Sequence, residues 1–593
     1  MLKKKGEIEE MIKELAKYIK QYKKYAILTP FMVILEIIME VVIPYLMARI
    51  IDVGIQNNDL DYIIRIGIML VISAIMSLIF GVLSGRFAAI ASSGFAKNLR
   101  QGMFYNIQNY SFTNIDKFST SSLVTRLTTD VTNVQNAFQM MIRALVRGPV
   151  MIVFALIMAF SINKELSLVY VATMVPLAIL LAFISIKAHP YFEKVFKKYD
   201  ELNRVVGENL NAIRVVKSFA TEDFEEKKFG DVNSLVYRLF KKAEKIVIFN
   251  SPLMQIAIYG CILLLSWLGA QTIVAGGMQT GQLSSLITYA WQILSSLMML
   301  SMVLVMIIIA QSSAERIVEV LTEEPTIKNR DKTIKEIKDG SIEFIDVDFQ
   351  YDDAKANEML PLEDINLKIN AGEVIGIIGG TGSSKTSLVN LIPRLYDVKS
   401  GFVKVGGIDV RDYDLESLRN EVAMVLQKNV LFSGTIAENL RWGNKDATDE
   451  ELVRACKLAQ ADGFIQELPD KYQTVLDQGG TNVSGGQKQR ICIARALLKK
   501  TKILILDDST SAVDTKTDAL IRKAFREEIP DTTKIIIAQR ISSIIDADKI
   551  IVMDNGRIDG IGTSEELLKT NKIYQEVYES QMGGDDANNE KQD

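Results

Sequence analysis

The clearest chemical signal in this sequence is a glycine-rich segment that is followed by a lysine and a hydroxyl residue. Residues 379–386 read GGTGSSKT, and they end a short apolar run, Glu373–Gly379, that is suited to a buried parallel strand. An apolar helix is expected next, over Ser387–Leu395. This order of elements forms a phosphate cradle, because backbone N–H groups and the positive end of a helix face the phosphates. The candidate phosphate contacts are Gly379, Gly380, Thr381, Gly382, Ser383, Ser384, Lys385, Thr386 and Ser387.

Three of these residues carry specific expectations. Lys385 would reach the β- and γ-phosphates of a nucleotide, and Thr386 would ligate Mg²⁺. The position before the lysine departs from the usual pattern, because glycine is expected there and this chain has Ser384. Glycine permits close backbone approach. We expect serine to be tolerated, at some loss of ATP affinity, if the backbone is helical at that residue, because its Cβ then costs little.

Other segments fit the same phosphate chemistry. Lys502–Asp507 (KILILD) is a second candidate buried strand, and it ends in the carboxylate that organises Mg²⁺ in such sites. Val483–Gln487 (VSGGQ) precedes an expected helix, and its serine and glycine amides suit a γ-phosphate held across an interface. Gln427 follows the apolar run Val422–Leu426, and residues 511–514 read SAVD. Together these segments predict a nucleotide-binding α/β domain.

That domain occupies only the second part of the chain. The 593 residues are too many for one ordinary domain. The apolar residues, 48% of the total, gather in the first half, so the mean hydropathy of +0.16 averages two unlike regions. A helix needs about 20 apolar residues to cross a bilayer. Six stretches reach this length and predict transmembrane helices: Ala26–Val53, Tyr62–Ala91, Met141–Ile162, Leu166–Lys187, Ile246–Ala275 and Leu283–Ala310.

Composition also predicts where the parts of the chain begin and end. Apolar residues within Glu7–Lys24 recur with helical spacing opposite lysines and glutamates, which predicts an amphipathic helix on the membrane surface or a plain cytoplasmic extension. The expected parts are an N-terminal helix (1–24), a transmembrane domain (25–321), a polar linker (322–341), a nucleotide-binding domain (342–580) and a polar, disordered tail (581–593).

Charge predicts the orientation in the membrane. Lys and Arg are concentrated before the first predicted span and after the second and fourth, whereas the loops on the other side are short and poor in both. The positive-inside rule therefore places both termini and the nucleotide-binding domain in the cytoplasm of a cell-membrane protein. A net charge of −4 argues against general nucleic-acid binding. The three cysteines fit no metal-site spacing, and the single His189 leaves no second imidazole for a His-pair metal site.

On these motifs, the chain resembles an ATP-binding cassette (ABC) exporter half-transporter, in which a six-helix membrane domain is fused to one nucleotide-binding domain. The resemblance implies ATP and Mg²⁺ as cofactors, and contact with membrane lipid. It implies that Tyr351 stacks on adenine, that Gln427 senses Mg²⁺, and that Asp514 ends the D-loop. Phe118–Gln135 and Ile213–Phe219 resemble the two cytoplasmic loops that touch nucleotide-binding domains. The signature residues Ser484, Gly485, Gly486 and Gln487 would contact the ATP of a partner subunit.

Two catalytic positions depart from the family pattern. Hydrolytic members have glutamate after the strand-ending Asp507, and this chain has Asp508, whose carboxylate would lie about 1.5 Å further from the attacking water. The expected switch histidine is Gln539, which cannot carry a proton near pH 7. The signature is intact. The resemblance therefore implies the degenerate subunit of a heterodimeric exporter, whose own site hydrolyses ATP poorly and whose signature completes the site of a partner with Glu and His.

The transported substrate is the least defined feature. Glu36 and Glu40 lie one helical turn apart within the first span and are candidates to line a pathway for amphipathic cations. They are equally suited to pair with Arg or Lys of a neighbouring helix. Met298, Met302 and Met306 suit either an adaptable drug-binding surface or ordinary packing. The main prediction is an exporter of drugs or other amphiphiles, and the alternatives are a lipid or peptide exporter subunit or a channel-like regulatory ABC protein.

Overall fold

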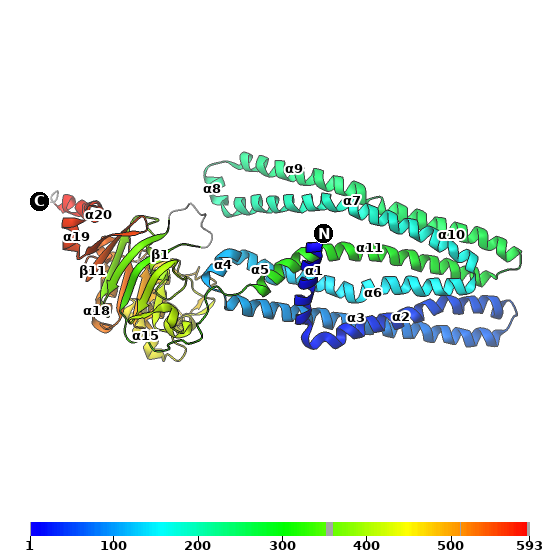
Figure 1. Ribbon diagram of the computed structural model, residues 1–593, viewed down its shortest axis with the longest axis horizontal. Helices are drawn as coiled ribbons and strands as arrows, with labels where there is room; N and C mark the ends of the chain where they lie inside the picture. The colour runs from blue at the N-terminus through cyan, green and yellow to red at the C-terminus, as the bar shows by residue number, and fades with distance from the viewer. Residues whose placement is uncertain (1, 352–359, 510, 590–593) are drawn as a thin grey trace. The chain divides into compact units, whose positions relative to one another are not determined.

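The computed structural model describes residues 2–351, 360–509 and 511–589, and it divides into two compact units (Figure 1). The first unit contains residues 1–108 and 120–323, and the second contains residues 109–119 and 324–593. The short segment 109–119 is thus part of the second unit, although it lies between helices of the first unit in the sequence.

The described residues of the first unit form only helices as regular structure (Figure 1). They are α1 (Leu2–Ala16), η1 (Lys17–Tyr22), α2 (Lys23–Arg49), η2 (Ile50–Ile55), α3 (Leu60–Gln108), α5 (Thr120–Thr125), η3 (Arg126–Asp130), α6 (Val131–Ile162), α7 (Lys164–Asn211), α8 (Ile213–Ser218), α9 (Glu222–Val247), α10 (Asn250–Val274) and α11 (Thr280–Thr322).

Six helical segments of this unit are long and apolar enough to cross a membrane, which confirms the predicted six-span fold. They are Ile8–Ile55, Leu60–Gln108, Thr120–Ile162, Lys164–Asn211, Glu222–Val274 and Thr280–Val303. Several exceed the length that a bilayer needs, because the helices continue beyond their apolar parts. Some polar groups between them bond to the backbone of a neighbouring helix: the Tyr289 hydroxyl of α11 donates to the Val41 carbonyl of α2 at 2.8 Å.

The N-terminal segment is bent where one amphipathic helix over Glu7–Lys24 was expected. Helix α1 ends at Ala16, and Lys20 in the following 3₁₀ segment has φ +42° and ψ −120°. The bend follows from packing on α3. The ring of Tyr22 lies where Gly94 has no side chain, and the Asn98 amide donates to the Tyr18 carbonyl at 2.8 Å.

The second unit is the predicted α/β domain, and its strands form two main sheets. Its elements are α4 (Phe112–Phe118), β1 (Ile342–Phe349), β2 (Leu362–Ile369), β3 (Val374–Gly379), α12 (Lys385–Asn390), β4 (Ser400–Val405), β5 (Ile408–Asp409), η4 (Val410–Asp412), α13 (Leu415–Asn420), β6 (Val422–Val425), β7 (Gly434–Thr435), α14 (Ile436–Arg441), α15 (Asp449–Leu458), α16 (Asp462–Glu467), η5 (Lys471–Gln473), β8 (Val475–Leu476), α17 (Gly485–Leu497), β9 (Ile503–Asp507), α18 (Thr515–Glu528), β10 (Thr533–Ile537), η6 (Ile541–Ser543), β11 (Lys549–Asp554), β12 (Arg557–Gly562), α19 (Ser564–Thr570) and α20 (Lys572–Asn589).

The larger sheet aligns the segments that carry the predicted site. Its order is β12-β11-β3-β10-β9-β6, and every pair from β11 to β6 is parallel. Strands β9 and β10 are buried along their whole length, as expected for nearly continuous apolar runs in a parallel sheet. Ile537 lies opposite both Ile377 and Asp507. The carboxyl ends of β3, β10 and β9 therefore meet at one edge, and the loops that follow them share it.

The remaining elements complete the domain. A smaller antiparallel sheet has the order β2-β1-β4-β5, and α14, α15 and α17 pack together as a helical subdomain. The predicted linker contains no helix, and Ile334 within it forms a bridge with Tyr413. At the C-terminus, α20 extends to Asn589, where a disordered tail was expected from residue 581; residues 590–593 lie outside the described part.

Candidate nucleotide-binding site

The glycine-rich turn leaves β3 and is held by its own lysine. A Cβ at Gly379 would stand 2.2 Å from the Met553 carbonyl oxygen of β11, so only glycine allows this close approach. The Nζ of Lys385 donates to the carbonyls of Gly379 at 2.9 Å and Gly380 at 2.7 Å. Burial lowers the pKa of Lys385, and the nearby carboxylates of the site act in the opposite direction. The ammonium group is thus positioned over the turn that is predicted to hold the phosphates.

Ser384 differs from the expectation in its backbone conformation. Its φ of +67° and ψ of +26° are left-handed, not right-handed helical, and it stands directly before α12. An L-residue in this conformation is disfavoured by about 1–2 kcal/mol, because Cβ approaches the following carbonyl oxygen. The serine therefore strains the turn at the position where the family pattern has glycine. The helix that follows is also shorter than predicted, since α12 ends at Asn390.

The two strongest Mg²⁺ candidates lie in direct contact. The hydroxyl of Thr386 donates to Oδ2 of Asp507 at 2.9 Å, and Asp507 is only 2% exposed. Burial raises the pKa of Asp507, and the adjacent charge of Asp508 adds to this effect. Gln427 lies exposed beyond the end of β6, at the same edge of the sheet. A hydroxyl, a carboxylate and an amide oxygen are the hard ligands that Mg²⁺ prefers, so these residues fit the ion.

Asp508 and Gln539, the two residues that depart from the family pattern, bind each other. Asp508 follows β9 with a left-handed φ of +47°, and its N–H donates to the Ile537 carbonyl of β10 at 3.0 Å. Gln539 follows β10, and its Nε2 donates to Oδ2 of Asp508 at 2.7 Å. One carboxylate oxygen is therefore occupied by a neutral amide donor.

The signature segment was expected to precede a helix, but α17 begins within it, at Gly485. Ser484 caps this helix: its hydroxyl accepts from the Gln487 N–H at 3.3 Å, and the Gln487 side chain accepts from the Ser484 N–H at 2.9 Å. A Cβ at Gly486 would stand 2.7 Å from the Ala512 carbonyl oxygen, so this glycine permits contact with the segment that contains Ala512. Ser484 and Gly485 are exposed and therefore accessible to a partner.

Two residues that the motif analysis missed hold the segment 511–514. Gln489 is buried on α17, and its Oε1 accepts from the Ala512 N–H at 3.1 Å. Arg540 follows the switch position and donates to the carbonyls of Ser511 at 3.0 Å and Val513 at 3.1 Å. The only hint in the sequence was that Gln489 lies two residues after the signature. Asp514 caps α18 by accepting from the Thr517 N–H, which holds the pKa of its carboxyl below the usual value.

Tyr351 belongs to an aromatic group beside the phosphate turn. Its hydroxyl is hydrogen-bonded to the Ser387 hydroxyl at 2.9 Å. Its ring and that of Tyr396 form a T-shaped pair, with a centroid distance of 5.2 Å and an interplanar angle of 88°. The Tyr396 hydroxyl donates to Oδ2 of Asp116 in α4 at 2.7 Å, and burial together with this carboxylate raises the pKa of Tyr396.

These contacts correct the predicted docking segment. The first cytoplasmic loop was expected to touch the nucleotide-binding domain through Phe118–Gln135, but the segment that belongs to this compact unit is 109–119. Helix α4 (Phe112–Phe118) supplies Phe112, whose ring centroid lies 5.9 Å from that of Tyr396, and Asp116. The second expected segment, Ile213–Phe219, forms the short helix α8.

Comparison with known proteins agrees with both units. The family described as "ABC transporter transmembrane region" matches residues 26–314, and the family described as "ABC transporter" matches residues 362–511. A Bacillus subtilis (strain 168) protein named "Uncharacterized ABC transporter ATP-binding protein YfiB" is 36% identical over 566 residues, which cover 95% of this chain and 98% of that protein. The chain belongs to the ABC transporter family.

The transporter has further relatives with more specific names. An "ATP-dependent lipid A-core flippase" of Desulfotalea psychrophila is 36% identical over 472 residues, which cover 78% of the transporter and 80% of the flippase. Among solved structures, a bacterial Atm1-family ABC exporter with ATP bound matches with a TM-score of 0.79 and 22% identity. That match covers 95% of the transporter and 99% of the other chain, and it shows that they share a fold.

Within the membrane domain, the two candidate pathway residues of the transporter are paired. Arg147 of α6 binds Oε1 of Glu36 at 2.5 Å and Oε2 of Glu40 at 2.6 Å, both on α2. The hydroxyl of Ser84 in α3 also donates to Glu36, at 3.3 Å. The pairing corresponds to the alternative in which these carboxylates neutralise a basic residue of a neighbouring helix. With two carboxylates and one guanidinium, this group of three residues keeps a formal charge of −1.

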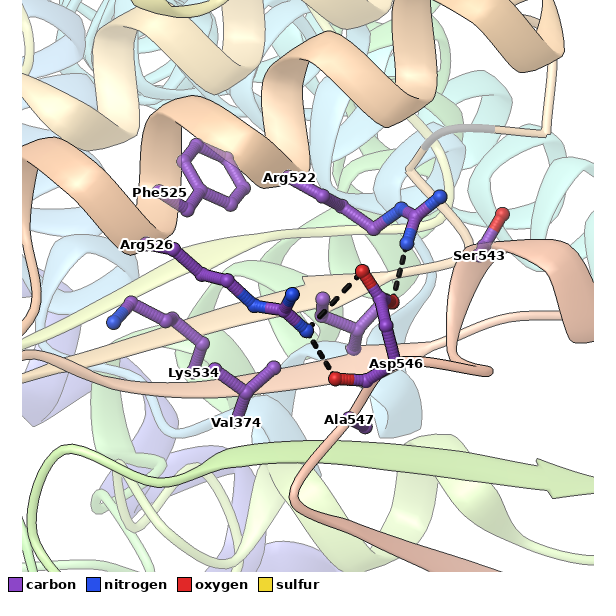
Figure 2. Close-up of a pocket in the computed structure, with 9 residues that line it drawn as sticks. Val374, Arg522, Phe525, Arg526, Lys534, Ser543, Asp546 and Ala547 are labelled. Atoms are coloured by element: carbon purple, nitrogen blue, oxygen red, sulfur yellow. Dashed lines mark hydrogen bonds and ion pairs between the residues drawn. The ribbon is translucent and has the colours of Figure 1, made fainter. Parts of the chain in front are cut away.

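A small pocket of the transporter lies at the opposite edge of the large sheet, where β3 and β10 begin. Figure 2 shows Arg522 and Arg526 of α18 reaching Asp546, and Arg526 binds its Oδ2 at 3.1 Å. Lys534 lines the pocket, is 2% exposed, and has a pKa lowered by burial. These ion pairs join α18 to the segment before β11, and the pocket lies away from the phosphate turn.

Proposed function

We propose that the chain is one subunit of a heterodimeric, ATP-driven exporter of drugs or other amphiphilic compounds. Its own site, built on Lys385, Thr386 and Asp507, binds ATP but hydrolyses it poorly. Its signature segment completes the hydrolytic site of a partner half-transporter that carries glutamate and histidine at the corresponding positions. Both termini and the nucleotide-binding domain face the cytoplasm, as the distribution of Lys and Arg in the loops favours.

The contact between Asp508 and Gln539 carries this proposal. A general base must reach the attacking water and accept its proton. Asp508 is one methylene shorter than glutamate, and Gln539 donates to its Oδ2 at 2.7 Å. Glutamine has no site that gains a proton near pH 7, so it supplies no charge to a transition state. The side chains at positions 508 and 539 thus hydrogen-bond to each other and leave one carboxylate oxygen unavailable to a water, which favours retention of ATP over its hydrolysis.

The remaining geometry supports a partner. Ser484 and Gly485 are exposed at the start of α17, where backbone N–H groups suit a phosphate of a facing subunit. Helix α8 and the turn after it expose Val215 and Phe219, the latter 75% accessible, as expected for a surface that docks on another protein. Clamping of two nucleotide-binding domains around ATP would drive the membrane helices between inward and outward access.

Each residue of the site would have its own part in binding. Lys385 would exchange its carbonyl acceptors for phosphate oxygens, and the Thr386 hydroxyl and the Asp507 carboxylate would hold Mg²⁺, with Gln427 beside them. When bound, Mg²⁺ neutralises the charge on the phosphates. The ring of Tyr351 would stack on adenine. Hydrolysis at the partner's site resets the cycle.

The test compares ATPase turnover of the purified full-length chain with that of its complex with a partner that has complete catalytic residues. We expect little turnover from the chain alone and robust turnover from the complex. The double substitution Asp508→Glu and Gln539→His should raise turnover of the chain alone by about tenfold or more, because general-base catalysis contributes 10²–10⁴-fold. Gln575→Met is a control expected to leave turnover unchanged, because the Gln575 side chain donates to the Leu568 carbonyl and, within the described part of the chain, forms no hydrogen bond with Asp508 or Gln539. Strong ATPase activity of the unaltered chain alone would refute the proposal.

A lipid is the second candidate substrate. A relative at 36% identity is named as a lipid A-core flippase, and Arg147 binds both carboxylates that would attract a cationic drug. Export assays with reconstituted complex separate the two candidates. ATP-dependent transfer of a labelled lipid between leaflets, without export of cationic dyes, would favour the lipid.

A further inference from the structure

One side chain of the C-terminal helix forms two hydrogen bonds with the switch segment. Gln581 of α20 accepts from the Ile541 N–H through Oε1 at 2.8 Å, and its Nε2 donates to the Gln539 carbonyl at 2.9 Å. One amide therefore satisfies a donor and an acceptor of the backbone on either side of Arg540. Such a two-point contact fixes the orientation of a short segment as well as its position.

The helix is anchored independently of this contact. Tyr574 is fully buried, its hydroxyl is hydrogen-bonded to that of Ser564 at 2.8 Å, and its N–H donates to the Asn571 side chain at 2.8 Å. Gln581 lies seven residues later and so on the same face of α20. It is exposed, and an exposed hydrogen bond adds little to stability. The contact is thus better suited to placing the switch segment than to holding the fold together.

The segment that Gln581 holds contains the residue that contacts Asp508. The Gln539 carbonyl accepts from Gln581, while the Gln539 side chain donates to Asp508. Ile541 is fully buried at the start of η6, so the far end of the segment is fixed by packing. Without Gln581, the backbone of residue 539 has one restraint fewer, and its side chain gains freedom relative to Asp508.

We propose that Gln581 is a positioning residue of the nucleotide site: it sets the switch backbone so that the side chain at position 539 is directed at residue 508. The proposal rests on the proposed function in taking positions 508 and 539 as the pair that faces the attacking water. It makes α20 a part of the nucleotide site, although α20 lies outside every motif of that site.

The first measurement is amide hydrogen exchange in the full-length chain. Gln581→Met keeps the length of the side chain and removes both hydrogen bonds. Exchange at Ile541 should become about two- to tenfold faster. Gln575→Met is the matched control, because Gln575 lies on the same helix and donates to the Leu568 carbonyl at 2.6 Å, away from the switch. It should leave Ile541 unchanged. Equal exchange at Ile541 in the Gln581→Met variant and the unaltered chain overturns the proposal.

The second measurement uses the chain with Asp508→Glu and Gln539→His. There Gln581→Met should lower kcat for ATP about three- to tenfold and leave KM within about twofold, because placement of the water-facing pair changes and nucleotide contacts do not. Gln581→Glu keeps the acceptor for Ile541 and should recover part of kcat. An unchanged kcat overturns the proposal. If the restored residues give no ATPase, the heterodimer proposal fails instead, and exchange at Ile541 alone decides the role of Gln581.

Discussion

Ser384→Gly should tighten ATP binding to the chain's own site. Serine at φ +67° is disfavoured by about 1–2 kcal/mol, whereas glycine adopts this conformation freely. Glycine in turn loses about 0.5–1 kcal/mol more conformational entropy when the turn is ordered. The net gain is about 0.5–1 kcal/mol. At 1.36 kcal/mol per tenfold, this gain corresponds to ATP binding about two- to fivefold tighter.

The assay is equilibrium titration of the full-length chain with a fluorescent ATP analogue in the presence of Mg²⁺. Ser384→Ala is the matched control, because alanine keeps Cβ in the left-handed conformation and removes only the hydroxyl. Its affinity should stay within about twofold of the unaltered chain. If the glycine and alanine variants tighten binding equally, the hydroxyl rather than the backbone conformation is responsible. If glycine brings no gain, Ser384 holds the left-handed conformation equally with and without ATP, and its strain cancels in the binding free energy.

Three other substitutions test different parts of the structure. Asp507→Asn should raise the unfolding temperature at pH 7 and abolish stabilisation by Mg²⁺-ATP. Because burial raises the folded-state pKa of Asp507, the difference in stability between the variant and the unaltered chain should narrow as pH falls through that raised pKa and vanish by the ordinary aspartate value; a difference that widens over this range would contradict the reasoning. Lys534→Met should raise the unfolding temperature and leave the ATPase activity of the complex unchanged. The rise in unfolding temperature should be larger at low pH than at high pH, because burial lowers the folded-state pKa of this lysine. A drop in stability would show that the ammonium group is well paired. Tyr396→Phe removes the hydrogen bond to Asp116 but keeps the ring, so ATP affinity should hold while transport per ATP hydrolysed falls; loss of ATP affinity instead would mean that the hydroxyl serves the nucleotide.

Local patterns in the sequence predict much of the fold. The six apolar stretches are long enough to indicate membrane spans by themselves. The segments that became β3 and β9 are short, continuous apolar runs, and both strands begin within one residue of the expected positions. The N-terminal bend was not predictable in this way, since it depends on tyrosine rings that pack against glycines of α3 far away in the sequence.

The residues of the candidate site likewise fall into those that local sequence predicts and those that only the fold reveals. Residue types and spacing indicate Lys385, Thr386 and Asp507, because their chemistry is tied to neighbours in the chain. The conformation of Ser384 depends on the path of the turn against β11, which no local pattern specifies. Gln489 and Gln581 act on segments 23 and 40 residues away, so only the folded chain reveals their partners.

Helix α4 has a practical consequence for anyone who isolates the ATPase portion. The second unit is assembled from two stretches of chain, 109–119 and 324–593, so a truncation that starts near residue 324 removes eleven residues from it. Tyr396 would lose its carboxylate acceptor and the ring of Phe112, and the Ser111 hydroxyl, 2.5 Å from that of Thr326, would be gone as well. Nucleotide affinities measured on such a fragment would describe a molecule with an uncovered aromatic surface beside Tyr351, and a fusion that attaches residues 109–119 to the fragment would be the better reagent.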